Sequence, residues 1–464
     1  MIFDSESVFE DNVITVLKQH GWKDGVLRYP TEQDLLNNWK GILYRNNNDI
    51  DRLGKYPLTD GEMAQIIEQI ETLRTPLALN SFVNGRTVSI TRDNKEDVAH
   101  FGKEISLYIY DRKEIAGGKS TYQIAQQPVY PAKNKMLNSR RGDLVLLING
   151  MPLIHIELKK SGIPVSQATN QIEKYTHEGV FTGLFRLVQI FVAMNPDDAV
   201  YFANPGVDKF NPSYYFHWAD YNNEPICGGQ NPGKDEWKLF IGGTSGTAGL
   251  LSIPMAHQLI GFYTIADSAD GCLKVLRSYQ YIAANAISDV VRKCDWEQRP
   301  TTPGRPGGYV WHTTGSGKTM TSFKSAQLIA DSHDADKVVF LMDRIELGTQ
   351  SLKEYRSFAD SETEVQGTEN TGVLRDKLNS TNVNDTLIVT SIQKMSNVKA
   401  GERGVTQAWL DQLAARRIVF IVDECHRSTF GDMLQDIRRS FPNALFFGCL
   451  LYTSDAADEL DGVD

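Results

Sequence analysis

The amino-acid sequence predicts an α/β chain with two domains whose sheets differ in type. Between residues 308 and 448, short apolar runs alternate with helical or loop segments: 308–311, 338–343, 386–391, 417–424 and 444–448. Such runs are typical of strands buried on both faces of a parallel sheet, and their alternation with helices predicts a doubly wound domain. The N-terminal part instead combines an amphipathic helix, a hairpin signature and a second helix, which predicts a mixed α/β domain.

The composition limits the class of protein. Of the 464 residues, 41% are hydrophobic and 23% are charged, which excludes a disordered or collagen-like chain. No run approaches the roughly 18 apolar residues of a membrane helix. The acidic start, MIFDSESVFED, lacks the apolar run of a signal peptide, so we expect a cytoplasmic protein. The five cysteines form no CxxC pair, which disfavours a zinc site and a disulfide framework.

The net charge of −10 argues against a non-specific nucleic-acid binder. The charge is unevenly distributed, however. Residues 133–160 contain six basic side chains, from Lys133 to Lys160, and only two acidic ones. A local basic patch is therefore compatible with the acidic total.

The first elements along the chain are a helix over residues 5–22 and a hairpin over residues 143–159. Asn149-Gly150 lies between the apolar runs DLVLLI and MPLIHIELK, which is a type I′ turn signature. A helix over residues 165–178 and a strand over residues 187–194 follow. These elements predict the mixed sheet of the N-terminal domain.

Polar residues on the hairpin suggest a catalytic metal site. Asp143 begins the first strand, and Glu157 and Lys159 lie two residues apart on the second, so both point to one face. Two carboxylates at a strand end can bind Mg²⁺ through oxygen ligands, and the metal generates hydroxide from water. The lysine would orient that water and offset charge on a phosphate. Gln171 and Tyr175 follow at i and i+4, on one face of the next helix.

This constellation resembles the PD-(D/E)xK nucleases with their QxxxY extension. The match is Asp143, Glu157-x-Lys159 and Gln171…Tyr175, although Gly142 stands where the pattern has proline. The resemblance implies that these five residues are catalytic and that Asp143 and Glu157 bind the metal. An exposed strand face with Glu and Lys is the alternative for the E-x-K segment alone.

Two nearby residues have competing interpretations. In this nuclease family an N-terminal helix often contributes a glutamate near the metal, which would be Glu10. Ser7-x-x-Glu10 is also a capping-box pattern, and we expect the cap. His155 shares the face of Glu157, but we expect it to pack in the core.

The domain limits follow from loop composition. Residues 222–248 are rich in Gly, Asn and Pro, which predicts a boundary region. We therefore expect one domain over residues 1–245 and a second over residues 246–448. The last segment, CLLYTSDAADELDGVD at residues 449–464, has no plausible domain end, and we expect it to be foreign sequence joined by a cloning or assembly error.

The segment HTTGSGKT at residues 312–319 predicts a phosphate-binding loop, because it follows a strand and opens a helix. In Gly315-Ser316-Gly317, the glycines let backbone N–H groups point into one concavity. Lys318 would reach the β- and γ-phosphates of ATP, and the Thr319 hydroxyl would ligate Mg²⁺. His312 stands where the strict pattern has glycine. The alternative is a strand–helix turn that binds nothing.

A second segment of the same domain, RIVFIVDECH at residues 417–426, ends an apolar strand in two carboxylates. Asp423 would lie near the Mg²⁺ of the phosphate-binding loop, and Glu424 would act as base toward the attacking water. His426 would couple the site to neighbouring elements. A solvated strand end is the alternative.

TGSGKT with DECH resembles the first RecA-like domain of superfamily 2 helicases and translocases. The resemblance implies that Gln280, in LRSYQ, contacts the adenine. It also implies that FLMDR (340–344) and TSIQK (390–394) touch the nucleic-acid backbone. Ordinary strand ends and loops are the alternative for each of these three segments.

A PD-(D/E)xK nuclease domain before such a motor resembles the restriction (R) subunit of type I restriction-modification enzymes. The resemblance implies the cofactors ATP and Mg²⁺, and as partners double-stranded DNA and the methyltransferase (modification) and specificity subunits. It implies ATP-driven translocation on DNA and cleavage of unmethylated DNA far from the recognition site. The second RecA-like domain of that family is not in these 464 residues, so we expect the chain alone to bind nucleotide without translocating. Another ATP-dependent nuclease–helicase of DNA repair and an inactive DNA- or partner-binding remnant remain alternatives.

Overall fold

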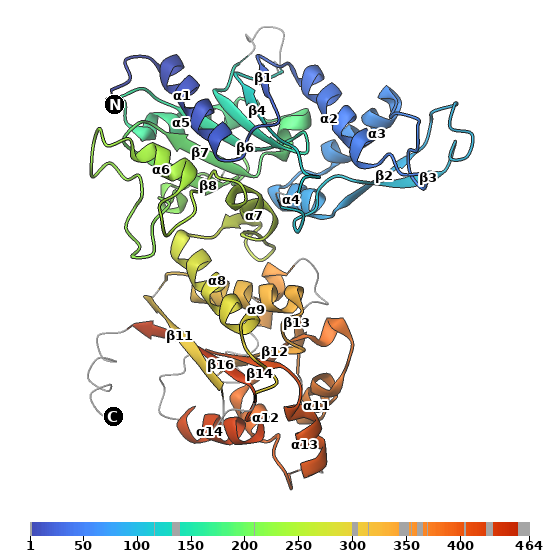
Figure 1. Cartoon of the computed structure of the whole chain (residues 1–464), viewed down its shortest axis with the longest axis vertical. Helices are drawn as coiled ribbons and strands as arrows, with labels where there is room; N and C mark the ends of the chain where they lie inside the picture. Colours follow the sequence, from blue (N-terminus) through green and yellow to red (C-terminus); the bar gives the residue numbers. More distant parts are fainter. Residues whose placement is uncertain are drawn as a thin grey trace. The chain divides into compact units, whose positions relative to one another are not determined.

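A computed structural model describes most of the chain, namely residues 2–115, 117–131, 140–207, 209–298, 305–313, 315–342, 352–353, 355–359, 365–368, 370–402, 405–423 and 430–452. The chain divides into two compact units, Met1–Tyr279 and Gln280–Asp464 (Figure 1). Within the described residues, every helix is too short or too polar to cross a lipid bilayer.

The first unit is built around a mixed six-stranded sheet, as predicted. Its strand order is β1 (Val26–Arg28), β4 (Tyr122–Gln126), β5 (Leu144–Ile148), β6 (Met151–Leu158), β7 (Ile190–Met194) and β8 (Ala199–Ala203). The β1–β4 and β6–β7 pairs are parallel and the other three are antiparallel. Strands β4 to β8 are buried along almost their whole length, so this sheet is the core of the unit.

The turn between β5 and β6 is the type I′ turn that the sequence predicts. Asn149 has φ 52° and Gly150 has φ 84°, and Ile148 pairs directly with Met151. Both central residues need positive φ in this turn, which asparagine and glycine tolerate best. The two-residue turn fixes the hairpin register and therefore decides which side chains face one another at its open end.

Helices and two small hairpins surround this sheet (Figure 1). The helices are α1 (Glu6–Gln19), α2 (Glu32–Asn46), α3 (Asp60–Thr72), α4 (Pro76–Asn84), α5 (Val165–His177), α6 (Glu236–Gly242) and α7 (Met255–Gly261), with 3-10 turns η1 (Gly183–Leu187) and η2 (Pro212–Tyr214). The hairpins are β2–β3 (Thr87–Thr91 and Glu104–Tyr108) and β9–β10 (Thr264–Asp267 and Cys272–Val275).

The two units divide at Tyr279 and not within residues 222–248. The segment after residue 245 is bound to the first unit by buried hydrogen bonds, from Trp22 Nε1 to the Leu251 carbonyl (2.6 Å) and from the Tyr201 hydroxyl to the Leu276 carbonyl (2.9 Å). Trp237 of α6 packs edge-on against Phe9 of α1. The Gly- and Pro-rich segment is thus a surface excursion of one folded unit, which loop composition cannot distinguish from a linker.

The second unit is a doubly wound domain, as predicted. Its six strands are all parallel, in the order β11 (Arg305–Thr313), β16 (Leu445–Tyr452), β15 (Ile418–Asp423), β12 (Lys337–Met342), β14 (Leu387–Ser391) and β13 (Val365–Gly367). Its helices are α8 (Ser278–Arg292, which begins in the first unit), α9 (Lys318–Ser332), α11 (Thr371–Asn379), α12 (Ile392–Ser396), α13 (Gln407–Ala414) and α14 (Phe430–Ser440), with the turn η3 (Val383–Asp385).

Both faces of this sheet are covered. Phe340 of β12 packs in a core with α8 and α9, whereas Leu341, the next residue, packs in a second core with α11 to α14. Successive strand residues point to opposite faces, so each strand is an uninterrupted apolar run. In Figure 1 the helices α8 and α9 lie on one side of the strands and α12 and α14 on the other.

The backbone of the last strand, β16, pairs with β11 as far as Tyr452. Residues 449–452 therefore continue the sheet, although the sequence assigned them to a foreign tail. Residues 453–464 lie outside the described part of the chain.

Candidate functional site

The hairpin β5–β6 brings Asp143, Glu157 and Lys159 together, and we call these three residues the carboxylate–lysine cluster. Leu144 pairs with Ile156, so Asp143 and Glu157 occupy the next positions along the two strands. Asp143 Oδ2 accepts a hydrogen bond from the Leu158 amide at 2.7 Å. Lys159 Nζ lies 3.5 Å from Glu157 Oε1, as expected for residues two apart on one strand.

The cluster is buried, and burial changes the protonation of both acids. It raises the pKa of Glu157 to about 7, with the charge of Lys159 opposing the rise. Burial and the charge of Glu157 raise the pKa of Asp143 well above its usual range. Both carboxylate oxygens of Glu157 are buried without a well-aligned hydrogen-bond donor. Two acids so close together and so poorly solvated require a further positive charge to ionise fully.

The arrangement fits a divalent metal ion of the hard, oxygen-binding kind. The unsatisfied Glu157 oxygens and the neighbouring Asp143 carboxylate are ligands that Mg²⁺ prefers. Within the described residues, no group of three or more His, Cys, Asp and Glu side chains gathers at one point. The cluster would therefore supply two carboxylates, and water or main-chain oxygen would complete the coordination.

His155 lies behind the cluster and combines both roles considered for it. It packs edge-on against Phe181 and Phe191 in the core. Its Nδ1 is 2.9 Å from the Tyr130 hydroxyl, and its Nε2 is 3.3 Å from Glu157 Oε2. Burial lowers the pKa of His155 to about 4, so the ring is neutral at pH 7. The hydroxyl of Tyr130 was not foreseen from the sequence.

The predicted capping box at Ser7 and Glu10 is wrong. Helix α1 begins at Glu6 after Ser5, and Glu10 lies buried in its second turn. The Glu10 carboxylate accepts hydrogen bonds from Gln126 Nε2 (2.7 Å) and Gln127 Nε2 (3.1 Å). Its charge contributes to the raised pKa of Asp143, so Glu10 is within electrostatic reach of the cluster. The glutamine pair in the apolar segment YQIAQQPVY was a signal that the sequence analysis missed.

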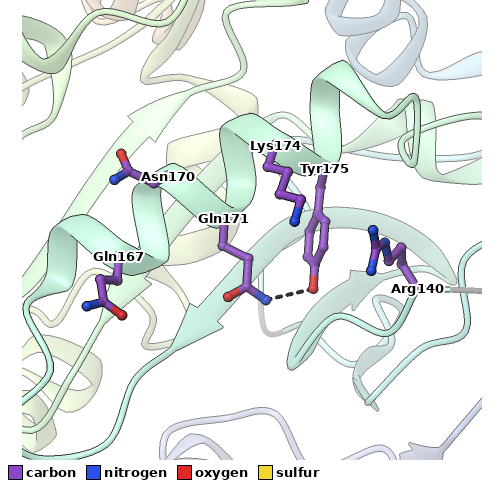
Figure 2. Close-up of a pocket in the computed structure, with 6 residues that line it drawn as sticks. All are labelled: Arg140, Gln167, Asn170, Gln171, Lys174 and Tyr175. Atoms are coloured by element: carbon purple, nitrogen blue, oxygen red, sulfur yellow. Dashed lines mark hydrogen bonds between the residues drawn. The ribbon is translucent and has the colours of Figure 1, made fainter.

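Gln171 and Tyr175 contact one another on α5. Gln171 Nε2 donates to the Tyr175 hydroxyl at 2.7 Å, and that hydroxyl donates to the Arg141 carbonyl at 3.0 Å. The pair therefore fixes the main chain two residues before Asp143. Figure 2 shows both side chains on the wall of a cavity of about 350 Å³, which is lined by Arg140, Gln167, Asn170, Gln171, Lys174 and Tyr175.

The predicted phosphate-binding loop connects β11 to α9 in the second unit. Gly315 has φ 76° and Gly317 has φ 82°, conformations that favour glycine. His312 at the end of β11 is buried, and its Nδ1 lies 2.9 Å from Ser316 Oγ. Burial and the nearby charge of Lys318 lower the pKa of His312 to about 4. Lys318 and Thr319 open α9, where the N-terminus of the helix favours an anion.

Gln280 of α8 lies against this loop. Its Nε2 donates to the carbonyls of Ser316 (3.4 Å) and Gly317 (3.2 Å). A Cβ atom at Gly317 would lie only 2.5 Å from Gln280 Nε2, so the close approach depends on glycine at this position. The structure thus joins Gln280 to the loop, although the two are 35 or more residues apart in the sequence.

The remaining predicted residues are described only in part. The backbone of Asp423 ends β15, between β12 and β16, while Glu424 and His426 lie outside the described residues. In the segment 390–394, Ser391 caps α12 and Lys394 Nζ donates to the Thr368 carbonyl at 2.6 Å. The end of the segment 340–344 also lies outside the described part.

Two family models match the chain, one on each unit. Residues 4–210 match the model described as "Type I restriction enzyme R protein N terminus". Residues 279–450 match the model described as "SWI2/SNF2 ATPase". The first match contains the whole carboxylate–lysine cluster, and the second contains the phosphate-binding loop.

Curated relatives are similar along nearly the whole chain. The type I restriction enzyme SsaAORF53P endonuclease subunit of Staphylococcus saprophyticus is 33% identical over 456 residues, which cover 97% of this chain and 42% of that protein. The SauCOLORF180P endonuclease subunit of Staphylococcus aureus is 34% identical over 450 residues, with the same coverage. The chain thus spans about two fifths of the length of these two relatives.

A shorter relative is covered almost completely by this chain. It is the C-terminal part of the type I restriction enzyme MpnIIP endonuclease of Mycoplasma pneumoniae. The two chains are 37% identical over 169 residues, which cover 36% of this chain and 80% of that protein.

Proposed function

The chain belongs to the type I restriction enzyme endonuclease subunits, and on that premise we propose that it cuts DNA with the carboxylate–lysine cluster and binds ATP at the loop before α9. The observation that supports this most strongly is the cluster itself, in which Asp143, Glu157 and Lys159 meet at the open end of a buried hairpin. A structural role for three charges there is disfavoured, because burying them is costly.

In this proposal, Asp143 and Glu157 would hold a Mg²⁺ ion. When bound, the ion would activate water and polarise the scissile phosphate. The ammonium group of Lys159 would orient the attacking water and offset the charge that builds up on the phosphate. The neutral ring of His155 and the hydroxyl of Tyr130 back Glu157 from the core side, which limits the positions open to its carboxylate. The Gln171–Tyr175 pair would keep the strand of Asp143 in place.

In the second unit, the amides of Gly315, Ser316 and Gly317 would bind the phosphates of ATP. Lys318 would lie against the β- and γ-phosphates, and the Thr319 hydroxyl and Asp423 would ligate Mg²⁺. Glu424 would accept a proton from the attacking water, and His426 would couple the site to its neighbours. The hydrogen bonds from Gln280 to the loop support a place for Gln280 beside the nucleotide.

The relatives extend the proposal to the whole enzyme. Because they are named as endonuclease subunits of type I restriction enzymes, we assign this protein a cytoplasmic complex with modification and specificity subunits. That complex would bind double-stranded DNA, translocate it by ATP hydrolysis and cut it when the recognition site is unmethylated.

The test compares cleavage of methylated and unmethylated plasmid by the protein assembled with its modification and specificity subunits. The proposal predicts cutting that requires ATP, Mg²⁺, both partner proteins and an unmethylated site. Cutting that ignores methylation and needs neither partner would instead identify a repair nuclease.

A further inference from the structure

The outer face of α5 is a polar stripe beside the carboxylate–lysine cluster. Gln167, Asn170, Gln171 and Lys174 follow one another at spacings of three, one and three residues, so they share one side of the helix. Gln167, Asn170 and Lys174 are exposed, while the opposite face packs Ala168 and Ile172 into the core. Figure 2 shows the four stripe residues along one wall of the cavity.

The chemistry of this cavity suits a polyanion. The six residues that line it supply amide, ammonium, guanidinium and phenol groups, and none is an aspartate or glutamate. Arg140 is bonded at 2.9 and 3.0 Å to both oxygens of Glu178, so its charge is largely balanced. Among the described residues Lys174 has no ion-pair partner, so its charge is available to a ligand.

The stripe is physically connected to the proposed catalytic groups. Gln171 bonds to Tyr175, and Tyr175 bonds to the main chain at Arg141, two residues before Asp143. Burial and then the charge of Glu157 raise the pKa of Tyr175 to about 12, which shows that its hydroxyl is within electrostatic reach of that carboxylate. A ligand in the cavity would therefore continue toward the cluster.

We infer that the outer face of α5 binds the sugar–phosphate backbone of the DNA strand that enters the carboxylate–lysine cluster. The inference rests on the proposed nuclease function and adds a location for the substrate. Gln167 and Lys174 are seven residues apart, which is about 10 Å along a helix axis. That length corresponds to about three phosphates of one strand in B-form DNA. Amide and ammonium donors contact phosphate and sugar oxygens without reading bases, so binding here is independent of sequence.

The experiment measures equilibrium binding of the chain to a 30-base-pair duplex, without Mg²⁺ or ATP, at several salt concentrations. Lys174→Ala is expected to weaken binding about fivefold at 0.1 M salt and to reduce the slope of log K against log salt by about 0.9, because one phosphate contact is lost. Gln167→Ala combined with Asn170→Ala is expected to weaken binding several-fold with the slope unchanged, because neutral donors displace no counterions. Lys103→Ala, at an exposed lysine of the β2–β3 loop, is the charge-matched control and is expected to change neither quantity.

Parental affinity and slope in both stripe variants would overturn the inference, as would a parent chain that does not bind the duplex. Normal DNA binding together with weaker capture of the modification or specificity subunit would also overturn it, and would make the stripe a protein interface. These binding results are independent of cutting. If Lys159→Ala still cuts in the assembled complex, the proposed nuclease site fails, whatever the stripe variants do.

Discussion

Lys159 Nζ lies 3.5 Å from Glu157 Oε1 in a position where the Glu157 side chain has no exposure to solvent. The strand alternation that brings them together also places Asp143 beside them, so two acids share one lysine. Partly satisfied buried charge of this kind destabilises a folded protein. Its presence at the end of an otherwise apolar hairpin indicates that the cluster is kept for its chemistry.

Replacing Glu157 with glutamine is therefore expected to stabilise the metal-free protein at pH 8. The pKa of Glu157 is raised from 4.5 to about 7, so between these values the folded state binds the proton more tightly, and above pH 7 the buried charge opposes folding. The gain is at most about 3 kcal/mol. Added Mg²⁺ should raise the melting temperature of the parent but not of Glu157→Gln. Glu104→Gln, at an exposed strand position, is the control. A Mg²⁺ response that survives in Glu157→Gln would contradict the metal assignment.

Replacing Lys318 with alanine is expected to lower the affinity for ATP by more than about tenfold, because the cation that faces the β- and γ-phosphates is lost. Lys399→Ala removes an exposed lysine that pairs with Asp436 in the same unit, and it should leave binding unchanged. Titration of a fluorescent ATP analogue measures both. Equal affinities in the two variants would show that the loop before α9 is not the nucleotide site.

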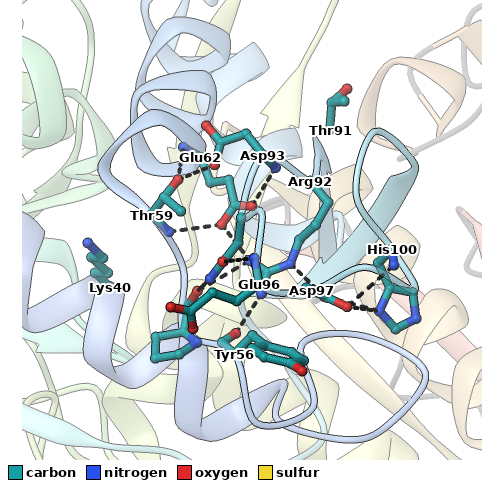
Figure 3. Close-up of polar contacts among 12 residues, drawn as sticks. Lys40, Tyr56, Thr59, Glu62, Thr91, Arg92, Asp93, Glu96, Asp97 and His100 are labelled. Atoms are coloured by element: carbon teal, nitrogen blue, oxygen red, sulfur yellow. Dashed lines mark hydrogen bonds and ion pairs between the residues drawn. The ribbon is translucent and has the colours of Figure 1, made fainter.

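Arg92 is a fully buried cation whose loss should destabilise the first unit. Its guanidinium pairs with Glu62 (2.6 Å) and Asp97 (2.9 Å) and donates to the Tyr56 carbonyl (2.6 Å) (Figure 3). Arg92→Leu leaves two buried carboxylates without their partner and is expected to cost about 3–5 kcal/mol in the free energy of unfolding.

The matched control for that variant is Arg86→Leu. Arg86 pairs with Asp111 on the surface, and losing such a pair costs less than about 1 kcal/mol. Urea unfolding compares the two variants. Equal losses of stability would mean that the buried network contributes nothing beyond an ordinary surface ion pair.

His257 is expected to make the first unit sensitive to acid. Burial lowers its pKa from 6.5 to about 4, and its ring is fixed by the Tyr122 hydroxyl (2.9 Å) and the Asp111 carbonyl (3.0 Å). Between pH 6.5 and 4 the unfolded chain binds the proton more tightly, so stability falls as the pH falls through this window. His257→Gln should lose less stability from pH 7 to pH 4.5 than the parent. His177→Gln, at a half-exposed site, should behave like the parent, and an unchanged pH slope in His257→Gln would refute the assignment.

Local sequence pattern was sufficient for the features that depend on neighbouring residues. Asn149-Gly150 determined the turn, the turn determined the register, and the register brought Asp143 beside Glu157. The apolar runs after residue 308 likewise predicted an all-parallel sheet, because a strand buried on both faces has no polar alternation.

Features that depend on distant partners were not accessible in this way. Ser7-x-x-Glu10 fits a capping box as well as a buried acid, and only the glutamines at 126 and 127 decide between them. The Gly-rich segment before residue 248 could be a linker until Trp237 is seen to pack on α1. Tyr130 beside His155 and Gln280 beside Gly317 are likewise contacts between segments far apart in the chain.

Cleavage by two adjacent lysine variants decides whether the hairpin is the nuclease site. Lys159 lies in the cluster, whereas Lys160, the next residue, is exposed on the opposite face of the strand end. In the protein assembled with its modification and specificity subunits, Lys159→Ala should abolish cutting of unmethylated plasmid while ATP hydrolysis continues at the parental rate. Lys160→Ala should cut like the parent. Normal cutting by Lys159→Ala, or loss of ATP hydrolysis with cutting retained, would contradict the account.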